Sequence, residues 1–385
     1  RMDAIAPFRV MQILALARQM EAAGRDVVHM EIGEPDFPST PPVLAAAAEA
    51  LGLGHTRYTP AAGLPALREA IAAYYGTRFG VQVDPQRILV TPGASGALQL
   101  VLGVSVEAGD RVLVTDPGYP CNRHMVSLFG GQPVALPVSA ETGYAPTRSA
   151  IAAELESGPV RALMLASPAN PTGNLVCNER LAELNGPLRE RDGALLVCDE
   201  IYQGLQYGGA AETALALGHD NVVVINSFSK YFGMTGWRVG WVVAPEPLCE
   251  PMERLAQNIF LAAPTPSQHA ALAAFSPANL AILEERRQVF GERRDYLLAA
   301  LRELGFEIPL APAGAFYLYA GLGRHGDDSL GFAAHLLEEA GVAVTPGPDF
   351  GSHLADRHLR FAYTTDLQRL EVGVERLHAF LRAGS

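Results

Sequence analysis

Short apolar runs alternate with amphipathic stretches through the first two thirds of the chain. The apolar runs are rich in β-branched residues and predict strands at residues 88–90, 111–115, 160–165, 194–198, 222–226 and 239–243. Helical patterns lie between them, near residues 97–105, 123–129, 148–155 and 179–191. This alternation predicts an α/β fold in which helices cover both faces of a largely parallel sheet.

The pattern changes after about residue 263. A long charged amphipathic stretch predicts a helix over 278–304, followed by short strands at 316–319, 342–344 and 359–362 and a last helix over 367–381. At the other end, a helix at 8–23 leads into a strand at 27–32 and is expected to pack on the C-terminal part or on a partner subunit. We therefore expect an N-terminal arm (1–40), a large domain (41–263) and a small α+β domain (264–385).

Composition narrows the possible partners. Hydrophobic residues make up 49% of the chain and charged residues 18%, and the net charge of −12 includes no block of consecutive basic residues, so neither nucleic acid nor an anionic membrane is an expected partner. No apolar run approaches the roughly 20 residues that span a bilayer, and no signal-peptide pattern opens the sequence. Four cysteines without metal-site spacing predict no metal. A cytoplasmic location is expected.

Polar residues follow the predicted strands. Thr91, Asp116, Ser167, Asp199 and Ser227 stand at or just past strand ends. Ligands of parallel sheets gather at the carboxyl ends of the strands, so the chemistry should converge at this edge.

The most informative segment surrounds Lys230. Ser227 and Ser229 precede it, Arg238 follows eight residues later, and Asp199 ends an apolar run thirty-one residues earlier. A desolvated lysine forms an imine with an aldehyde, and hydroxyls with a guanidinium suit a phosphate dianion. A buried carboxylate keeps a pyridine nitrogen protonated. This set is what an enzyme needs to hold pyridoxal 5′-phosphate (PLP).

A second phosphate signal is the turn at residues 91–97, Thr-Pro-Gly-Ala-Ser-Gly-Ala, which follows a strand and opens a helix. Backbone amides at such a helix start bind phosphate. The turn matches neither the dinucleotide-binding nor the P-loop pattern, because their glycine spacing and Lys-Ser/Thr pair are missing.

Together these motifs resemble the class I/II aminotransferases of PLP fold type I, and the resemblance runs from about residue 8 to the C-terminus. It implies a large domain with a mainly parallel seven-stranded sheet plus a smaller α+β domain. Lys230 is then the Schiff-base lysine and proton shuttle, and Asp199 and Tyr202, in Asp-Glu-Ile-Tyr, belong with the cofactor ring. The implied phosphate ligands are Gly93, Ala94, Ser95, Ser227, Ser229 and Arg238.

The same resemblance places further residues. Asn170, in Asn-Pro-Thr-Gly, contacts the 3′-oxygen of the cofactor, and Tyr119 stacks on its ring. Tyr58 reaches the phosphate of the partner subunit, which implies a homodimer with shared active sites. Arg360 interrupts an apolar strand, where a charge needs a partner, and would bind the substrate α-carboxylate beside Gly33. Plainer structural roles also fit, such as a helix N-cap for Asp199, a core position for Tyr119 and local packing for Tyr58.

The implied reaction moves an amino group from an L-amino acid to a 2-oxo acid in ping-pong fashion. The chain departs from well-known aspartate transaminases, because the stretch 256–264 has no arginine nearer than Arg254, so a neutral or apolar donor fits at least equally well. A C–S lyase or a cyclopropane-forming synthase could use the same constellation. The ligand-sensing half of a transcription regulator is a weaker alternative, since only about 30 residues precede Gly33.

Overall fold

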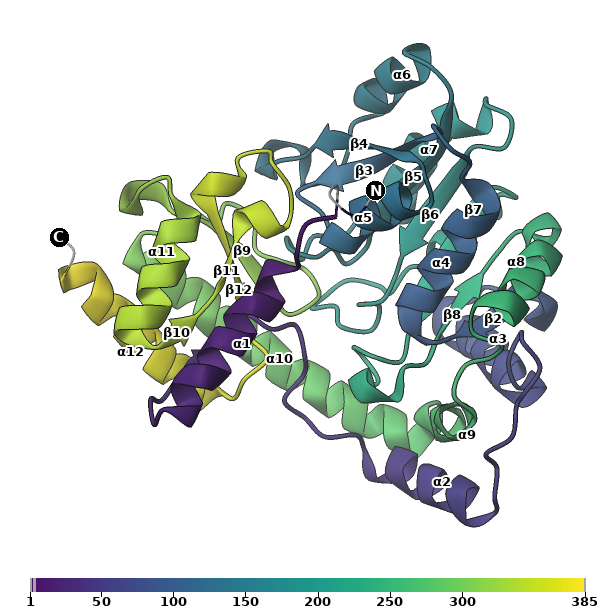
Figure 1. The fold of residues 1–385 in the computed structure, drawn as a ribbon, viewed down its shortest axis with the longest axis horizontal. Helices are drawn as coiled ribbons and strands as arrows, with labels where there is room; N and C mark the ends of the chain where they lie inside the picture. Colours follow the sequence, from purple (N-terminus) through teal and green to yellow (C-terminus); the bar gives the residue numbers. More distant parts are fainter. Residues whose placement is uncertain (1, 3–4, 384–385) are drawn as a thin grey trace.

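A mostly parallel seven-stranded sheet forms the centre of the computed structural model, which describes residue 2 and residues 5–383 (Figure 1). Residues 1, 3–4 and 384–385, at the ends of the expected arm and small domain, lie outside the described residues. The strand order is β2-β8-β7-β6-β5-β3-β4, and β8 alone runs opposite to the other six strands. The strands are β2 (Ile88–Thr91), β3 (Arg111–Asp116), β4 (Gln132–Pro137), β5 (Val160–Ala166), β6 (Leu195–Asp199), β7 (Val222–Ser227) and β8 (Gly240–Val243). The predicted α/β architecture is confirmed.

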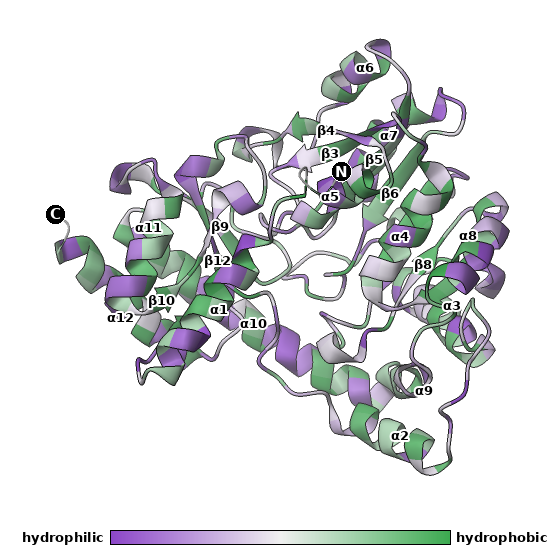
Figure 2. Ribbon diagram, viewed as in Figure 1, coloured by the Kyte–Doolittle hydropathy of each residue, from purple (hydrophilic) through white to green (hydrophobic). Residues whose placement is uncertain are grey.

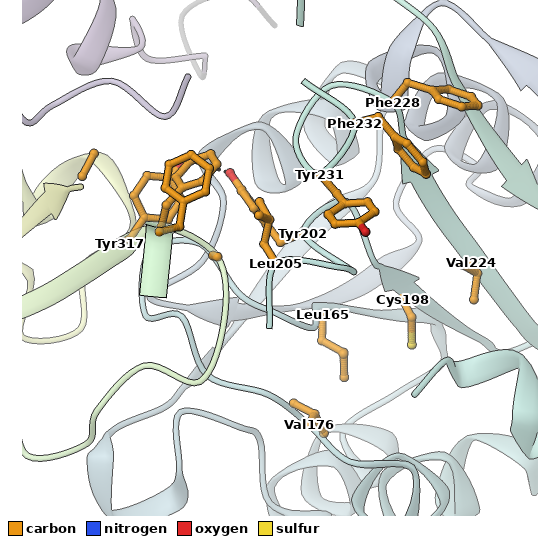
Figure 3. Packing of buried hydrophobic residues seen from close by; sticks show 14 of the residues in the cluster. Leu165, Val176, Cys198, Tyr202, Leu205, Val224, Phe228, Tyr231, Phe232 and Tyr317 are labelled. Carbon is orange, nitrogen blue, oxygen red and sulfur yellow. Dashed lines mark hydrogen bonds between the residues drawn. The ribbon is translucent and has the colours of Figure 1, made fainter. Parts of the chain in front are cut away.

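Alternate residues of the central strands bury opposite faces. In β7, Val222 and Val224 join one apolar cluster, whereas Val223 and Ile225 join the other. This period of two is the reason that the sequence shows continuous apolar runs, because both faces of the sheet are covered. Figure 2 shows these strands largely in the hydrophobic colour, and Figure 3 shows part of one cluster.

Helices cover both faces. Apolar residues of α4, α5 and α8 belong to the second cluster, and those of α3, α6 and α7 belong to the first. Within the described residues, the α-helices are α1 (Arg9–Ala22), α2 (Pro41–Gly52), α3 (Pro65–Phe79), α4 (Gly93–Ser105), α5 (Pro120–Leu128), α6 (Arg148–Glu156), α7 (Asn178–Arg189), α8 (Glu246–Ile259), α9 (Thr265–Ala274), α10 (Pro277–Leu304), α11 (Ser329–His335) and α12 (Leu367–Ala383).

Two small sheets contain the strands of the C-terminal part. One has the order β11-β12-β9 and is antiparallel, built from β9 (Tyr317–Gly321), β11 (Thr345–Pro346) and β12 (His358–Ala362). The other pairs β1 (Val28–His29) with β10 (Val342–Ala343) in parallel. Helix α1 packs on β10 and β11, as expected for the N-terminal helix. In Figure 1, α10 runs from α2 and α9 toward β9.

Local sequence explains the ends of α10. The Ser276 hydroxyl accepts a hydrogen bond from Asn279 N at 3.3 Å, Pro277 occupies the first turn, and Gly305 ends the helix with φ of +96°. These are the preferred capping residues at a helix start and stop. Helix α1 lacks a cap of its own, and the Asp349 carboxylate instead accepts from Arg9 N at 2.9 Å.

Two expectations for strands were wrong. The run 27–32 forms only the two paired residues of β1. Beyond β1, Met30 N donates to Ala343 O at 2.9 Å and Met30 O accepts from Ala362 N at 2.7 Å, so the chain stays beside the C-terminal strands without extending the ladder. Strand β4 was missed, since its prolines and its mostly exposed residues do not show a strand pattern. It pairs with β3 alone, at the sheet edge.

Two contacts tie distant segments together. One joins the segment after β1 to α10, and the other joins the end of β3 to the C-terminal part. Arg293 of α10 holds both carboxylate oxygens of Asp36 at 2.9 Å, which fixes the segment just after Gly33. Asp116, at the end of β3, accepts from Ser352 N at 3.0 Å. Among the described residues, no helix has the length and apolar character needed to cross a membrane.

Candidate active site

Strand ends bring the predicted site residues to one edge of the central sheet. Asp199 is the last residue of β6, Lys230 lies three residues past β7, and Asn170 and Tyr119 follow β5 and β3. Arg360 enters from β12 of the small antiparallel sheet. These residues line a single cavity of about 360 Å3 between the two sheets.

The cavity gathers most of the residues singled out from the sequence. Those that line it are Gly33, Ala94, Ser95, Tyr119, Asn170, Asp199, Tyr202, Ser229, Lys230, Arg238 and Arg360. Gly93 and Ser227 lie behind this lining, and Tyr58 lies elsewhere, on the surface.

Burial shifts the pKa values of Lys230 and Asp199 in opposite directions from those the groups have in water. Burial lowers the pKa of Lys230 to about 8, and burial raises the pKa of Asp199 to about 6. Lys230 Nζ donates to the Gly33 carbonyl oxygen at 2.6 Å. Asp199 Oδ1 accepts from Ile201 N at 3.1 Å within the turn that follows β6. No helix begins among the described residues of this turn, so Asp199 is not the helix N-cap considered from the sequence.

The predicted phosphate ligands form two layers. Ser229 and Arg238 line the cavity, and the Ser227 hydroxyl stands behind, donating to Ser229 Oγ at 2.9 Å or to Val239 O at 3.1 Å. Gly93, with φ of +70°, lets the guanidinium of Arg238 approach, because a Cβ there would lie 2.5 Å from Arg238 Nη2. Ser229 is therefore the serine with access to a ligand.

Arg360 is buried and held by neutral oxygens. Its Nη1 donates to Asn170 Oδ1 at 2.9 Å, and its Nη2 donates to the Glu31 carbonyl oxygen. Its Nε is buried without a hydrogen-bond partner among the described residues. No carboxylate neutralises this charge among those contacts, so the guanidinium remains available for an anion.

Aromatic side chains form the wall beside Arg360. The Tyr202 hydroxyl lies 2.8 Å from the Tyr317 hydroxyl, and Arg360 Cζ lies 4.2 Å from the centre of the Tyr317 ring. Tyr119 is half-buried, and its ring contacts that of Phe8 edge-on at 6.4 Å between centres. Because it lines the cavity, it is more than a core residue.

Several lining residues were missed from the sequence. Helix α1 and the residues before it contribute Phe8, Val10 and Met11, and Tyr317 comes from β9. Their sequence signal is that of ordinary buried apolar or aromatic residues. The arrangement of α1 against the cavity depends on tertiary packing that periodicity does not reveal.

Comparisons of sequence and of structure both match this chain to aminotransferases. The family model described as aminotransferase class I and II matches residues 25–377. The valine–pyruvate aminotransferase of Mycobacterium tuberculosis is 38% identical over 379 residues, covering 98% of this chain and 97% of that protein. The aspartate aminotransferase of Geobacillus stearothermophilus is 35% identical, covering 100% and 98%. A crystal structure of an aminotransferase from Mycobacterium tuberculosis matches with TM-score 0.94 and 37% identity, covering 99% of this chain and 98% of that one.

The chain belongs to the class I and II aminotransferase family and has the fold of PLP-dependent transferases of fold type I. It is an aminotransferase, and its cofactor is PLP. The cavity fits that cofactor: it offers a buried amine of lowered pKa, a buried carboxylate, and hydroxyl and guanidinium donors beside the first turn of α4.

Proposed function

We propose that this aminotransferase takes its amino group from L-amino acids with neutral or apolar side chains and passes it to a 2-oxo acid. The observation behind the proposal is the charge of the cavity lining. Among the described residues that line it, the cationic side chains are Lys230, Arg238 and Arg360, and each has a role in holding the cofactor or the α-carboxylate. Glu34 adds a negative charge that opposes a second carboxylate on the donor.

The rest of the lining supports the same preference. Phe8, Val10, Met11, Ile32 and Leu98 supply an apolar surface at the cavity. Burying an aliphatic side chain against such a surface is favourable by about 0.8 kcal/mol per methylene group. The relative named valine–pyruvate aminotransferase in Mycobacterium tuberculosis is consistent with an aliphatic donor.

In this proposal, one set of residues binds the phosphate of the cofactor and another set binds its ring. Ser229, Arg238, Ser95 and the amides of Gly93 and Ala94 hold the phosphate, with Ser227 supporting Ser229 from behind. In the bound state PLP supplies an aldehyde that condenses with amines and a ring that withdraws electron density from the substrate α-carbon.

The ring end needs four side chains. Asp199 pairs with the ring nitrogen, Asn170 and Tyr202 donate to the 3′-oxygen, and Tyr119 packs on the ring face. Stacking of this kind contributes about 0.5–1.5 kcal/mol beyond burial.

The chemical work falls to Lys230 and Arg360. Arg360, held by its hydrogen bond to Asn170, orients the substrate α-carboxylate beside the backbone of Gly33. Lys230 Nζ would be the base that takes the proton from the substrate α-carbon and holds it for return. Its pKa of about 8 puts the neutral base within reach at physiological pH.

A homodimer completes the site in our proposal. Tyr58 is 84% exposed, so it does not pack locally. Its segment is tied to the start of α9, since Thr265 Oγ1 donates to Arg57 O at 2.6 Å, and exposed Ile259 and Leu261 precede that helix. We assign this surface to a second copy of the chain, whose phosphate site receives Tyr58. Sedimentation velocity checks it: a Leu261→Asp protein should become monomeric and lose cofactor.

We also propose the division into an N-terminal arm (1–40), a large domain (41–263) and a small α+β domain (264–385). The small sheet of β9, β11 and β12, which is separate from the central sheet, supports a second domain in the C-terminal part. A cytoplasmic location remains part of the proposal, and fractionation of the native source tests it.

A donor panel tests the proposed specificity. Purified holoenzyme is given valine, leucine, alanine or aspartate as donor with a 2-oxo acid, and the new amino acid is quantified. The proposal expects kcat/KM to be highest for an aliphatic donor. A preference for aspartate would overturn it, and release of ammonia or a thiol in place of transfer would favour the lyase alternative.

A further inference from the structure

Tyr317 links two parts of the site that have separate tasks. Its hydroxyl lies 2.8 Å from the Tyr202 hydroxyl, and its ring centre lies 4.2 Å from Arg360 Cζ. The side chain is 1% exposed, so neither contact competes with bulk water. Figure 3 shows the side chains of Tyr202 and Tyr317 next to each other among residues of the buried cluster.

Either tyrosine can donate the hydrogen bond between the two hydroxyls, and the role of Tyr202 selects the direction. Each hydroxyl carries one proton and can accept through its lone pairs. For Tyr202 to donate into the cavity, its oxygen must accept the proton of Tyr317. A hydroxyl that accepts a hydrogen bond becomes a better donor, because bonds in such a chain polarise one another.

The backbone is shaped around the same hydroxyl. A Cβ at Gly33 would lie 1.7 Å from the Tyr317 oxygen and 2.8 Å from its Cζ. The Gly33 carbonyl also accepts from Lys230 Nζ at 2.6 Å. The position of the Tyr317 hydroxyl therefore requires a glycine at residue 33.

Strand register fixes the second contact. Tyr317 pairs with Ala362 and Tyr319 with Arg360 across β9 and β12, so the Arg360 side chain reaches diagonally over the Tyr317 ring. A guanidinium held flat on an aromatic face presents its edge to a ligand. Phe350 lies 4.8 Å from Arg360 Cζ and contributes a second ring.

We propose that Tyr317 is a positioning residue that serves both tasks. Its hydroxyl directs the proton of Tyr202 toward the 3′-oxygen of the bound cofactor, and its ring sets the plane of Arg360 for the substrate carboxylate. This inference rests on the proposed roles of Lys230, Tyr202 and Arg360.

The two halves separate experimentally. In holoenzyme of Tyr317→Phe the ring remains and the hydroxyl is lost. The pKa of the Lys230–cofactor linkage, read from its visible absorbance, should rise by about 0.3–1 unit. The reason is that Tyr202, whose hydrogen bond favours the deprotonated linkage, becomes a weaker donor. The KM for the amino donor should change less than about twofold. In Tyr317→Leu the KM should rise by roughly 2- to 30-fold as the ring contact is lost.

Tyr319→Phe is the matched control. Tyr319 lies on the same strand, is equally buried, and its hydroxyl has no hydrogen-bond partner among the described residues. Its Phe variant should leave the linkage pKa unchanged. If Tyr317→Phe titrates like Tyr319→Phe, the hydroxyl has no positioning role and the inference is overturned.

A double variant guards against an indirect effect on folding. If Tyr317 acts through Tyr202, then Tyr202→Phe shifts the linkage pKa upward and adding Tyr317→Phe shifts it no further. Additive shifts would contradict the proposed chain of hydrogen bonds. A wild-type protein without any lysine-linked absorbance would refute the proposed role of Lys230 itself, an outcome distinct from an unshifted titration in Tyr317→Phe.

Discussion

Replacing Gly33 with alanine tests the packing at the centre of the site. The added Cβ would meet the Tyr317 hydroxyl oxygen at 1.7 Å, and the whole Tyr317 ring is buried, so the tyrosine cannot swing into solvent. Gly33 does not have a positive φ, so backbone strain does not contribute. Overpacking of this kind costs about 1–3 kcal/mol, and displacing Tyr317 also loses its bond to Tyr202, about 0.5–1.5 kcal/mol. Gly33→Ala should therefore lower the free energy of unfolding by about 1.5–4.5 kcal/mol.

The assay is urea unfolding of the apoprotein, with Gly52→Ala as the matched control. Gly52 ends α2, and a Cβ there meets nothing within 4 Å. Its alanine variant should be neutral or more stable by up to about 1 kcal/mol, because alanine costs less backbone entropy in a helix. Equal stability of wild type, Gly33→Ala and Gly52→Ala would refute the steric reasoning.

The remaining predictions concern charge. Arg360→Lys keeps a cation but loses the two-nitrogen fork, so kcat/KM for the amino donor should fall roughly 10- to 150-fold in steady-state assays. The pKa of Lys230 falls from 10.5 to about 8 on burial, so between these pH values the unfolded chain binds more protons and the contribution of Lys230 to apoprotein stability rises with pH; denaturation of wild type and Lys230→Met across this range measures it. Hydrogen bonding to Glu31 raises the pKa of His29 above 6.5, so its stabilisation is complete below that pH and disappears as pH rises through the folded-state pKa. His29→Gln should flatten that part of the stability profile.

Residues at strand ends were predictable because their positions follow from chain order. Lys230 and Asp199 stand directly after buried parallel strands, and such ends meet at one edge of the sheet whatever the loops do. Arg360 was visible for another reason, since a charge inside an apolar strand needs a partner.

Other features depended on packing that the sequence does not display. Strand β4 is a mostly exposed edge strand containing Pro133 and Pro137, which count against a strand in any pattern analysis. Tyr317 has the same local pattern as a core aromatic, and only its contacts distinguish it. The order of the two serines, with Ser229 at the cavity and Ser227 behind, depends on how the loop after β7 turns.

The most direct test of the role of Lys230 uses the lysine content of the chain. Lys230 is the only lysine in the sequence. Borohydride reduction of the holoenzyme, followed by peptide mass spectrometry, should therefore place the cofactor mass on the peptide that contains Lys230, and prior addition of an amino donor should prevent the labelling. A Lys230→Ala protein then has no ε-amino group left to label. Cofactor fixed on the α-amino group in the wild type, or labelling that an amino donor does not prevent, would contradict the account.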